Sequence, residues 1–548
     1  MIIPIILTIL GTVFQGVAMF RSGAMYDFGI GYWGPLARDG VWHEALVGQL
    51  TKSFIPQNPG LAGFPLTNYH YFYDLLIAII HKFGIPSNFL IYRFLPVILS
   101  VALGIGTYKL AQVLFKDKLV SYLAVFFAFF ASSFGWIASL IKHEQIGGES
   151  TFWANQPVSM NLNPPYAISL VIIIFCILLI DSYIKKGGFL KAVAIIVLSG
   201  TLIGFKVYAG VILLGGLFVL TAKRLIIDKD KKLIPVFIFS SLITLAIFLT
   251  QDRLSLGLLQ FNPFWLINTM IDAGDRVGIP NFTLRRFAYL AEGKWPYLIA
   301  LEFICFLIFF VGNLGTRVVG FWKFDRKNMG KDLPMFILSM MVISFIPPLL
   351  FTQKGNPWNI VQFFYYFLYF AGLFAAVSVR KLPLWIAVIV ILITPISSAA
   401  TFRSWLYPNP PAYLSVGEYN GLKFLSTQDD GIVLKHPFNQ GARSGFKDPY
   451  PLSVYADNAY VSAHSAKSVF IEDVEQQVVL NTNHKERLEG ATRFFIEKDL
   501  SWSNKFLKDN NIKYVYLPKI YQLPMAEGEY LMNKIFENGG VNIYKVLE

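Results

Sequence analysis

A polar and aromatic stretch after the first hydrophobic segment contains the side chains best suited to chemistry. Asp39, His43 and Glu44 lie within Asp39–Leu50, whose residue spacing predicts a short amphipathic helix. Asp39 and His43 are four residues apart, which places them on one face of that helix. A carboxylate beside an imidazole is suited to general-base catalysis, because the imidazole can orient a substrate or adjust the pKa of the carboxylate. The alternative is that Asp39 only caps the helix, a position that Asp often occupies.

Two familiar motifs in this stretch do not indicate the functions they usually carry. Gly29–Gly34 matches Gly-x-Gly-x-x-Gly, but it follows a hydrophobic span rather than a strand, which argues against dinucleotide binding. We expect these glycines to permit tight turns around aromatic side chains. His43-Glu44 begins like a zinc-protease motif, but Val47 stands where the motif His-Glu-x-x-His needs its second histidine.

The composition predicts a polytopic membrane protein. Of 548 residues, 55% are hydrophobic and 15% are charged, whereas soluble domains carry about 25% charged residues. Apolar runs that approach the length of a membrane crossing predict about eleven spans, among them Leu119–Ile141 and Lys191–Phe205. Cys176 and Cys305 fall inside such runs, so we interpret them as packing residues rather than a disulfide or metal pair.

The positions of Lys and Arg predict how the spans are oriented. The connectors that carry Lys and Arg, such as Lys185-Lys186 and Arg380-Lys381, are called the basic connectors. They all fall on one side if Tyr69–Phe83 lies on the membrane surface, and the positive-inside rule makes that side cytoplasmic. The net charge of +13 is then largely a topology signal and does not indicate nucleic-acid binding. The first segment lacks a basic n-region and a cleavage site, so we expect it to remain as a helix. This topology predicts a multi-pass cell-membrane protein with a cytoplasmic N-terminus and an extracytoplasmic C-terminus.

The chain divides into two predicted domains. Residues 1–403 form a transmembrane domain that includes the extracytoplasmic loop 21–87 with its two surface helices. A proline-containing linker then leads into alternating short strand-like and helical patterns, which predict an extracytoplasmic α/β domain over residues 404–548. The predicted strands are Ile432–Lys435, Tyr460–Ala463, Lys513–Leu517 and Val541–Val546, and the predicted helices are His484–Ile496, Asn504–Asn510 and Tyr530–Glu537.

Three short motifs resemble those of the GT-C glycosyltransferases, a superfamily that includes the protein mannosyltransferases, aminoarabinose transferases and oligosaccharyltransferases. Asp39-Gly-Val-Trp-His43 sits where that superfamily places its acidic loop residue. Phe64–Tyr69 resembles the family's Pro-Leu-x-x-Tyr opening of the second surface helix, and Gly204–Tyr208 resembles its Lys-bearing break between two short spans. The chain departs from the pattern in two places, because Gly follows Asp39 and no basic residue precedes Pro65.

The resemblance implies a polytopic GT-C fold over about the first 400 residues and the activity of a hexosyl- or pentosyltransferase. The donor would be a sugar on polyprenyl phosphate, and the acceptor a hydroxyl of a glycan, lipid or protein. Asp39 is the candidate general base, with His43, Glu44, Tyr69 and His70 as first-loop neighbours. The departing phosphate needs cations, and the candidates are Lys206, Arg285, Arg286, Lys354 and Arg403.

These cations have alternative interpretations. Lys206 is the strongest candidate, because it interrupts an apolar region where an unpaired charge is expensive. Its alternative role is snorkelling at a helix end. The pair Arg285-Arg286 fits a solvated loop equally well, and the segment around Lys354 also fits a tight turn with an interfacial tryptophan.

The sequence identifies no certain cofactor, and it allows a divalent metal ion without supporting one. His143, Glu144 and Glu149 lie in the second outer loop, the region that supplies metal ligands in the oligosaccharyltransferases, but they form no paired acidic motif. Glu302 lies within a span and needs a partner that the sequence does not name. Two other functions are a transporter or flippase of lipid-linked sugars, which would need no catalytic loop, and a non-catalytic assembly protein for surface polymers. We expect the C-terminal domain to bind or position the acceptor.

Overall fold

The computed structural model describes residues 2–143, 145–251, 259–322 and 330–547. By internal contacts, the chain forms two compact units. Unit 1 comprises Met1–Val17, Pro96–Thr250 and Leu256–Leu406, and unit 2 comprises Ala18–Leu95, Gln251–Ser255 and Tyr407–Glu548. The first loop therefore shares a compact unit with the C-terminal region, whereas the predicted division at residues 403 and 404 assigns that loop to the transmembrane domain.

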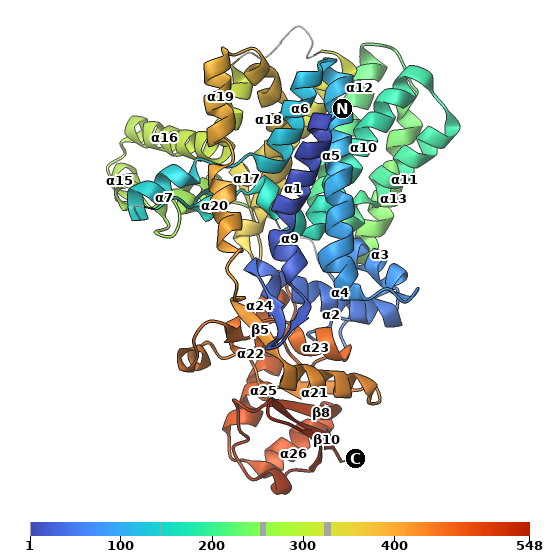
Figure 1. Cartoon of the computed structure of the whole chain (residues 1–548), viewed down its shortest axis with the longest axis vertical. Helices are drawn as coiled ribbons and strands as arrows, with labels where there is room; N and C mark the ends of the chain where they lie inside the picture. Colours follow the sequence, from blue (N-terminus) through green and yellow to red (C-terminus); the bar gives the residue numbers. More distant parts are fainter. Residues whose placement is uncertain (1, 144, 252–258, 323–329, 548) are drawn as a thin grey trace. The chain divides into compact units, whose positions relative to one another are not determined.

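Unit 1 is built from long apolar helices (Figure 1). Its longer helices are α1 (Ile2–Arg21, whose last residues fall in unit 2), α5 (Leu95–Phe115), α6 (Lys118–Phe130), α10 (Pro164–Lys186), α11 (Phe189–Phe205), α12 (Val207–Ile226), α13 (Leu233–Gln251), α15 (Pro280–Ala291), α16 (Trp295–Leu314), α17 (Asp332–Leu350) and α18 (Gln362–Arg380). The shorter elements are α7 (Gly135–His143), α8 (Glu149–Phe152), α9 (Gln156–Leu162), β3 (Leu259–Phe261), α14 (Trp265–Asp272), η3 (Gly315–Phe321), β4 (Phe351–Gln353), η5 (Pro357–Val361), α19 (Leu384–Ile393) and α20 (Ile396–Ser404).

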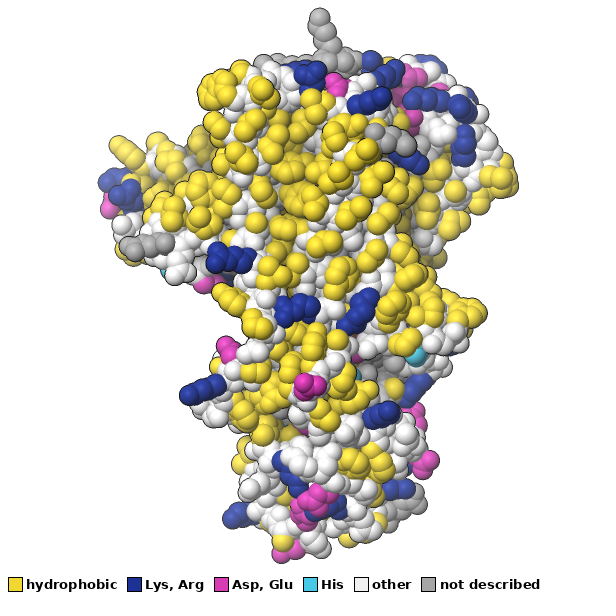
Figure 2. All heavy atoms as spheres, in the orientation of Figure 1, with side chains coloured by type: hydrophobic (Ala, Val, Ile, Leu, Met, Phe, Trp, Pro, Cys, Tyr) yellow, Lys and Arg dark blue, Asp and Glu magenta, His cyan; other side chains and the backbone are white. Residues whose placement is uncertain are grey.

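Within the described residues, nine helices are long and apolar enough to cross a membrane. The helices α6 and α7, bent by 43° at a short break, add a tenth if they form one span, as predicted for Leu119–Ile141. The helix α11, with 17 residues, matches the remaining predicted span. Figure 2 shows hydrophobic side chains over the surface of this unit, with Lys and Arg gathered at the end that carries the N-terminus.

The core of unit 1 surrounds α18, whose side chains are buried on almost every side. A helix that is apolar all round belongs in a protein interior, and the rings of Phe364 and Phe367 pack on Phe345 of α17. Small residues let neighbouring helices approach closely. At Gly216 of α12, for example, a Cβ atom would lie only 2.5 Å from the side chain of Met340 of α17.

Unit 2 combines the first loop with the C-terminal region. The first loop contributes β1 (Ala24–Tyr26), β2 (Gly29–Tyr32), η1 (Gly34–Ala37), α2 (Asp39–Lys52) and α3 (Phe72–His81). The start of the next candidate span adds α4 (Ser87–Phe89) and η2 (Leu90–Phe94). The helices of the C-terminal region are α21 (Val416–Thr427), η6 (Gln440–Gly445), α22 (Leu452–Tyr455), α23 (Tyr460–Ser465), α24 (Val474–Val479), α25 (Lys485–Ile496), α26 (Leu500–Asp509) and η7 (Glu527–Glu529). Its strands are β5 (Ala412–Ser415), β6 (Ile432–Lys435), β7 (Tyr450–Pro451), β8 (Ile512–Pro518), β9 (Met532–Glu537) and β10 (Val541–Val546).

A four-stranded sheet of order β1-β2-β5-β7 joins the two parts of unit 2. Its strands β2 and β5 pair antiparallel, with Gly29 opposite Ser415. The prediction that the glycines of Gly29–Gly34 form tight turns is therefore wrong for the part that lies in β2. Gly29 has a φ of +123°, and a Cβ atom there would lie 2.0 Å from the carbonyl oxygen of Leu414, so the strand needs glycine for this close approach.

The second sheet, of order β6-β8-β10-β9, lies in the C-terminal region. Three predicted strands and two predicted helices are confirmed as β6, β8, β10, α25 and α26. The predicted strand Tyr460–Ala463 is wrong, because these residues begin helix α23, where the Asn458 side chain accepts a hydrogen bond from the Tyr460 backbone N–H at 3.1 Å. The predicted helix Tyr530–Glu537 is also wrong, because pairing with β10 makes Met532–Glu537 an edge strand.

Candidate functional site

The structure confirms the predicted helix that begins at Asp39. Asp39 is the first residue of α2 and is exposed, and Arg38 occupies the cap position before it. The positive end of the helix dipole favours a carboxylate at this place. The apolar side chains Val41 and Ala45 are fully buried in unit 2, so α2 packs within the protein along most of its length.

The predicted neighbours Tyr69 and His70 lie in the irregular segment before α3. Their rings stack on each other with centroids 5.1 Å apart, and Tyr69 also meets the edge of Trp42 of α2 at 5.9 Å. Burial raises the pKa of the Tyr69 phenol well above its ordinary value, and the charges of Asp74 and then Asp39 add to this effect. The Tyr69 hydroxyl is thus within electrostatic reach of the candidate base.

His43 belongs to a buried pair with Asp74 of α3. The His43 Nδ1 atom lies 2.7 Å from Asp74 Oδ1, and both side chains are buried. Burial raises the pKa of Asp74, while the neighbouring imidazole lowers it. The pair ties α2 to α3. The signal that could have identified Asp74 was its place in an otherwise apolar helix, where a carboxylate needs a partner.

Glu44 lies in a second buried network. Its Oε1 atom accepts hydrogen bonds from the Tyr92 hydroxyl at 2.7 Å and from the Tyr32 hydroxyl at 3.4 Å. Burial raises the pKa of Glu44 to about 7 and lowers that of His464, which lies 4.0 Å from Glu44, to about 4. His464 is therefore neutral at pH 7, and its contact with Glu44 is not an ion pair. The sequence carries no local signal for His464, because its partners lie more than 400 residues away.

The start of α2 also contacts the C-terminal region. Arg38 forms an ion pair with Glu475 of α24. Asp473 caps the same short helix and accepts a hydrogen bond from the Gln476 backbone N–H at 3.2 Å. Burial, followed by the charge of Asp457, raises the pKa of Asp473 well above its usual range, while Arg38 lowers it.

Lys206 lies in unit 1, at the predicted break between two helices. It is extended between α11 and α12 and only 3% exposed. Its Nζ atom donates to Asn163 Oδ1 at 3.1 Å and lies 5.5 Å from the centroid of the Tyr208 ring. Further polar contacts surround it, since the Asn163 amide donates to Gln362 and the Tyr208 hydroxyl donates to Gln353 at 2.7 Å.

The other four candidate cations lie in three other segments of unit 1. Arg286 of α15 forms ion pairs with Asp272 at 2.9 Å and with Glu302 at 2.6 Å, which identifies the partner that Glu302 requires within its span. The remaining three are exposed, and they are Arg285 of α15, Lys354 after β4 and Arg403 of α20. Arg286 thus already serves two carboxylates.

Among the described residues, no group of three or more His, Cys, Asp and Glu side chains could hold a metal ion. Of the second-loop residues weighed for such a site, His143 is exposed at the end of α7, and Glu144 lies outside the described residues. Cys176 and Cys305 are both buried and form no disulfide.

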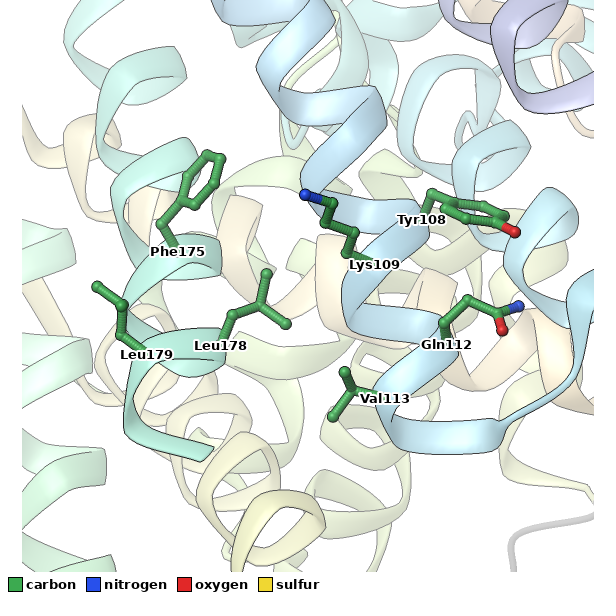
Figure 3. A pocket seen from close by; sticks show the side chains of 7 residues that line it. All are labelled: Tyr108, Lys109, Gln112, Val113, Phe175, Leu178 and Leu179. Carbon is green, nitrogen blue, oxygen red and sulfur yellow. The ribbon is translucent and has the colours of Figure 1, made fainter. Parts of the chain in front are cut away.

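A groove of about 450 Å³ lies between α5 and α10 of unit 1 (Figure 3). In the figure, Lys109 and Val113 face the gap from α5, and Phe175, Leu178 and Leu179 line it from α10. The groove contains none of the predicted site residues, and its lining is mainly apolar.

No protein-family model and no curated protein sequence matches this chain. Solved structures do match. The apo oligosaccharyltransferase of Archaeoglobus fulgidus aligns with 94% of this chain and 69% of its own, at 11% identity and a TM-score of 0.50. The A. fulgidus oligosaccharyltransferase AglB, in complex with an inhibitory peptide and a dolichol-phosphate, gives the same coverage, at 12% identity and a TM-score of 0.48. ArnT from Cupriavidus metallidurans bound to undecaprenyl phosphate aligns with 98% of this chain and 97% of its own, at 10% identity and a TM-score of 0.39. These proteins are GT-C membrane glycosyltransferases.

Proposed function

We propose that this chain, which has the GT-C fold, is an integral-membrane glycosyltransferase. It transfers a sugar from a polyprenyl-phosphate donor to an acceptor hydroxyl on the extracytoplasmic side. The observation that carries the proposal is the shared fold along almost the whole chain, together with an exposed carboxylate, Asp39, at the start of a buried loop helix. The donor class is taken from the fold, because GT-C enzymes use lipid-linked sugars.

Asp39 is the proposed general base. As the acceptor oxygen forms its bond to the anomeric carbon of the sugar, its proton passes to the Asp39 carboxylate, and the bond from that carbon to the phosphate oxygen breaks. Polyprenyl phosphate leaves with the electron pair of the broken bond. Such a base typically contributes about 10²–10⁴-fold in rate. The exposure of Asp39 supports this role, since the proton acceptor must be reachable, and the neighbouring buried pairs of α2 hold it on a rigid element.

Lys206 is the proposed contact for the donor phosphate. Its ammonium group is fixed at a helix break by Asn163 and lies beside the Tyr208 ring, within a set of carboxamide and hydroxyl groups. A fixed cation stabilises the negative charge that develops on a departing phosphate. Arg286 is not proposed for this role, because Asp272 and Glu302 already balance its charge.

The proposed side of the membrane rests on topology. Eleven crossings among the described residues, which count the bent pair α6–α7 and the shorter α11, would put the N-terminal and C-terminal segments on opposite sides of the membrane. The basic connectors then support a cytoplasmic N-terminus and an extracytoplasmic first loop and C-terminal region.

One experiment tests the two roles together. Transfer from a labelled polyprenyl-phosphate sugar is measured in membranes containing the wild type, Asp39→Asn or Lys206→Met. We expect Asp39→Asn to lose at least about 100-fold in kcat and Lys206→Met to lose both donor affinity and rate, because its cation acts on bound donor and on leaving phosphate alike.

The matched controls are Asp27→Asn, an exposed acid between β1 and β2, and Lys191→Met, in the first turn of α11. Both are expected to keep wild-type transfer. Full transfer by Asp39→Asn, in protein that inserts and folds normally, would show that Asp39 is not the general base.

A further inference from the structure

The C-terminal region of unit 2 contacts α2 along its whole length. At the start of the helix, Arg38 pairs with Glu475. In the middle, Tyr32 joins Glu44 to His464 through hydrogen bonds of 3.4 and 3.0 Å. At the end, Lys52 pairs with Asp430 at 3.0 Å. Because α2 carries Asp39 as its first residue, the contact at the start of the helix is the one that bears on where that carboxylate lies within unit 2.

The loop that follows α2 is bound to the same region by backbone hydrogen bonds. The Glu472 N–H donates to the Gly60 carbonyl at 3.0 Å, and the Ala62 N–H donates to the Val469 carbonyl at 2.9 Å. Asn58 and Gln477 form a reciprocal amide pair, both fully buried, with distances of 2.7 and 3.2 Å. The segment that leads into α24, the helix of Glu475, is therefore fixed to the first loop and is not a mobile appendage.

We propose that Glu475 is a positioning residue for Asp39, acting through Arg38. Of the contacts above, the Arg38–Glu475 ion pair is the one formed by the residue covalently next to Asp39. Arg38 also sets the entry of the chain into α2, because it is the cap residue of that helix. Holding its guanidinium on α24 fixes the first turn and keeps the Asp39 carboxylate in one place. This inference rests on the proposed function, and it gives the C-terminal region a part in catalysis other than acceptor binding.

The far end of α2 provides a matched control. The Lys52–Asp430 pair links the same helix to the same region and is also a surface ion pair, with side chains 39% and 71% exposed against 34% and 62% for Arg38 and Glu475. It lies about 20 Å from Asp39 along a helix that rises 1.5 Å per residue. Exposed pairs of this kind contribute little to stability, so both can be broken without unfolding the protein.

The test measures kcat, KM and Tm for Glu475→Gln, Arg38→Gln, Glu475→Asp and Asp430→Asn in the full-length protein. We expect the first two to lower kcat by about tenfold with KM little changed, since misplacing a reacting group acts on the chemical step. Glu475→Asp keeps a carboxylate and is expected to recover at least half of kcat. Asp430→Asn is expected to keep wild-type kcat and to show the same small change in Tm as Glu475→Gln.

Wild-type kcat for Glu475→Gln would overturn the inference, as would an equal loss for Asp430→Asn, which would indicate general loosening of α2. Asp39→Asn is measured alongside. If that variant retains transfer, the proposed base is wrong. If it is inactive while Glu475→Gln is fully active, only the positioning role fails.

Discussion

Glu44→Gln is expected to stabilise the protein at alkaline pH and to have progressively less effect as the pH falls. Glu44 is buried, and its pKa of about 7 lies above its ordinary value of 4.5, because the loss of water outweighs its hydrogen bonds from Tyr92 and Tyr32. The folded state therefore holds this proton more tightly than the unfolded chain does. Folding stability falls as the pH rises from about 4.5 to about 7, and the full penalty applies above that range.

The size of the effect follows from the two pKa values. At about 1.4 kcal/mol for each pKa unit, the rise from 4.5 to about 7 corresponds to about 3 kcal/mol of lost unfolding free energy near pH 8. A glutamine has nearly the same shape and stays neutral, and its carbonyl oxygen can still accept the Tyr92 hydroxyl, which lies 2.7 Å from the present carboxylate. The variant should therefore regain most of this free energy near pH 8 and very little below about pH 4.5.

The assay follows thermal unfolding of the detergent-purified protein by intrinsic fluorescence between about pH 5 and pH 8. The difference in Tm between Glu44→Gln and wild type is expected to grow with pH. Glu529→Gln changes an exposed glutamate in η7 and is expected to leave the pH dependence unchanged. A Tm difference for Glu44→Gln that is constant with pH, or that favours the wild type most at pH 8, would show that ionisation of Glu44 does not destabilise the folded protein.

Two further substitutions probe the packing within each unit, Gly60→Ala in unit 2 and Arg286→Met in unit 1. Gly60→Ala is expected to destabilise the protein by about 1–3 kcal/mol, because the new Cβ atom would lie 2.5 Å from the Glu472 carbonyl oxygen. Gly528→Ala is the control, because no atom lies within 4 Å of its Cβ position. Equal Tm values for the two variants would show that the close approach at Gly60 is not the cause. Arg286→Met should destabilise by about 2–4 kcal/mol, because it leaves the carboxylates of Asp272 and Glu302 without their cation. Arg285→Met, at the exposed neighbouring position, should have little effect on Tm, and a similar loss in both variants would show that the ion pairs are not the cause.

Local patterns predicted much of the fold. The apolar runs predicted the long helices of unit 1, and the polar Lys206 marked the break between α11 and α12. Both features could be predicted because they depend on the hydropathy and charge of a single segment. The helix at Asp39 was also predictable from spacing alone. The resemblance of three short motifs to those of the GT-C glycosyltransferases implied the GT-C fold, and the structural match confirms that fold.

Features that depend on distant partners could not be predicted. The edge strand β9 has a helix-like sequence and becomes a strand only because β10 pairs with it. The pairing of β2 with β5, and of Glu44 with His464, joins residues close to 400 positions apart, so no local pattern records it. For the same reason, the domains predicted from the sequence put the first loop and the C-terminal region in different domains, whereas the structure places both in one compact unit.

The most direct test of the central claim uses purified wild-type protein reconstituted in vesicles with a polyprenyl-phosphate sugar that carries a label in the sugar. We expect label to appear in a glycoside of a hydroxyl acceptor while an equal amount of free polyprenyl phosphate forms, and we expect Asp39→Asn to abolish both. Movement of the intact labelled donor between leaflets, with its glycosyl bond unbroken and at a rate unaffected by Asp39→Asn, would contradict the account and favour a flippase.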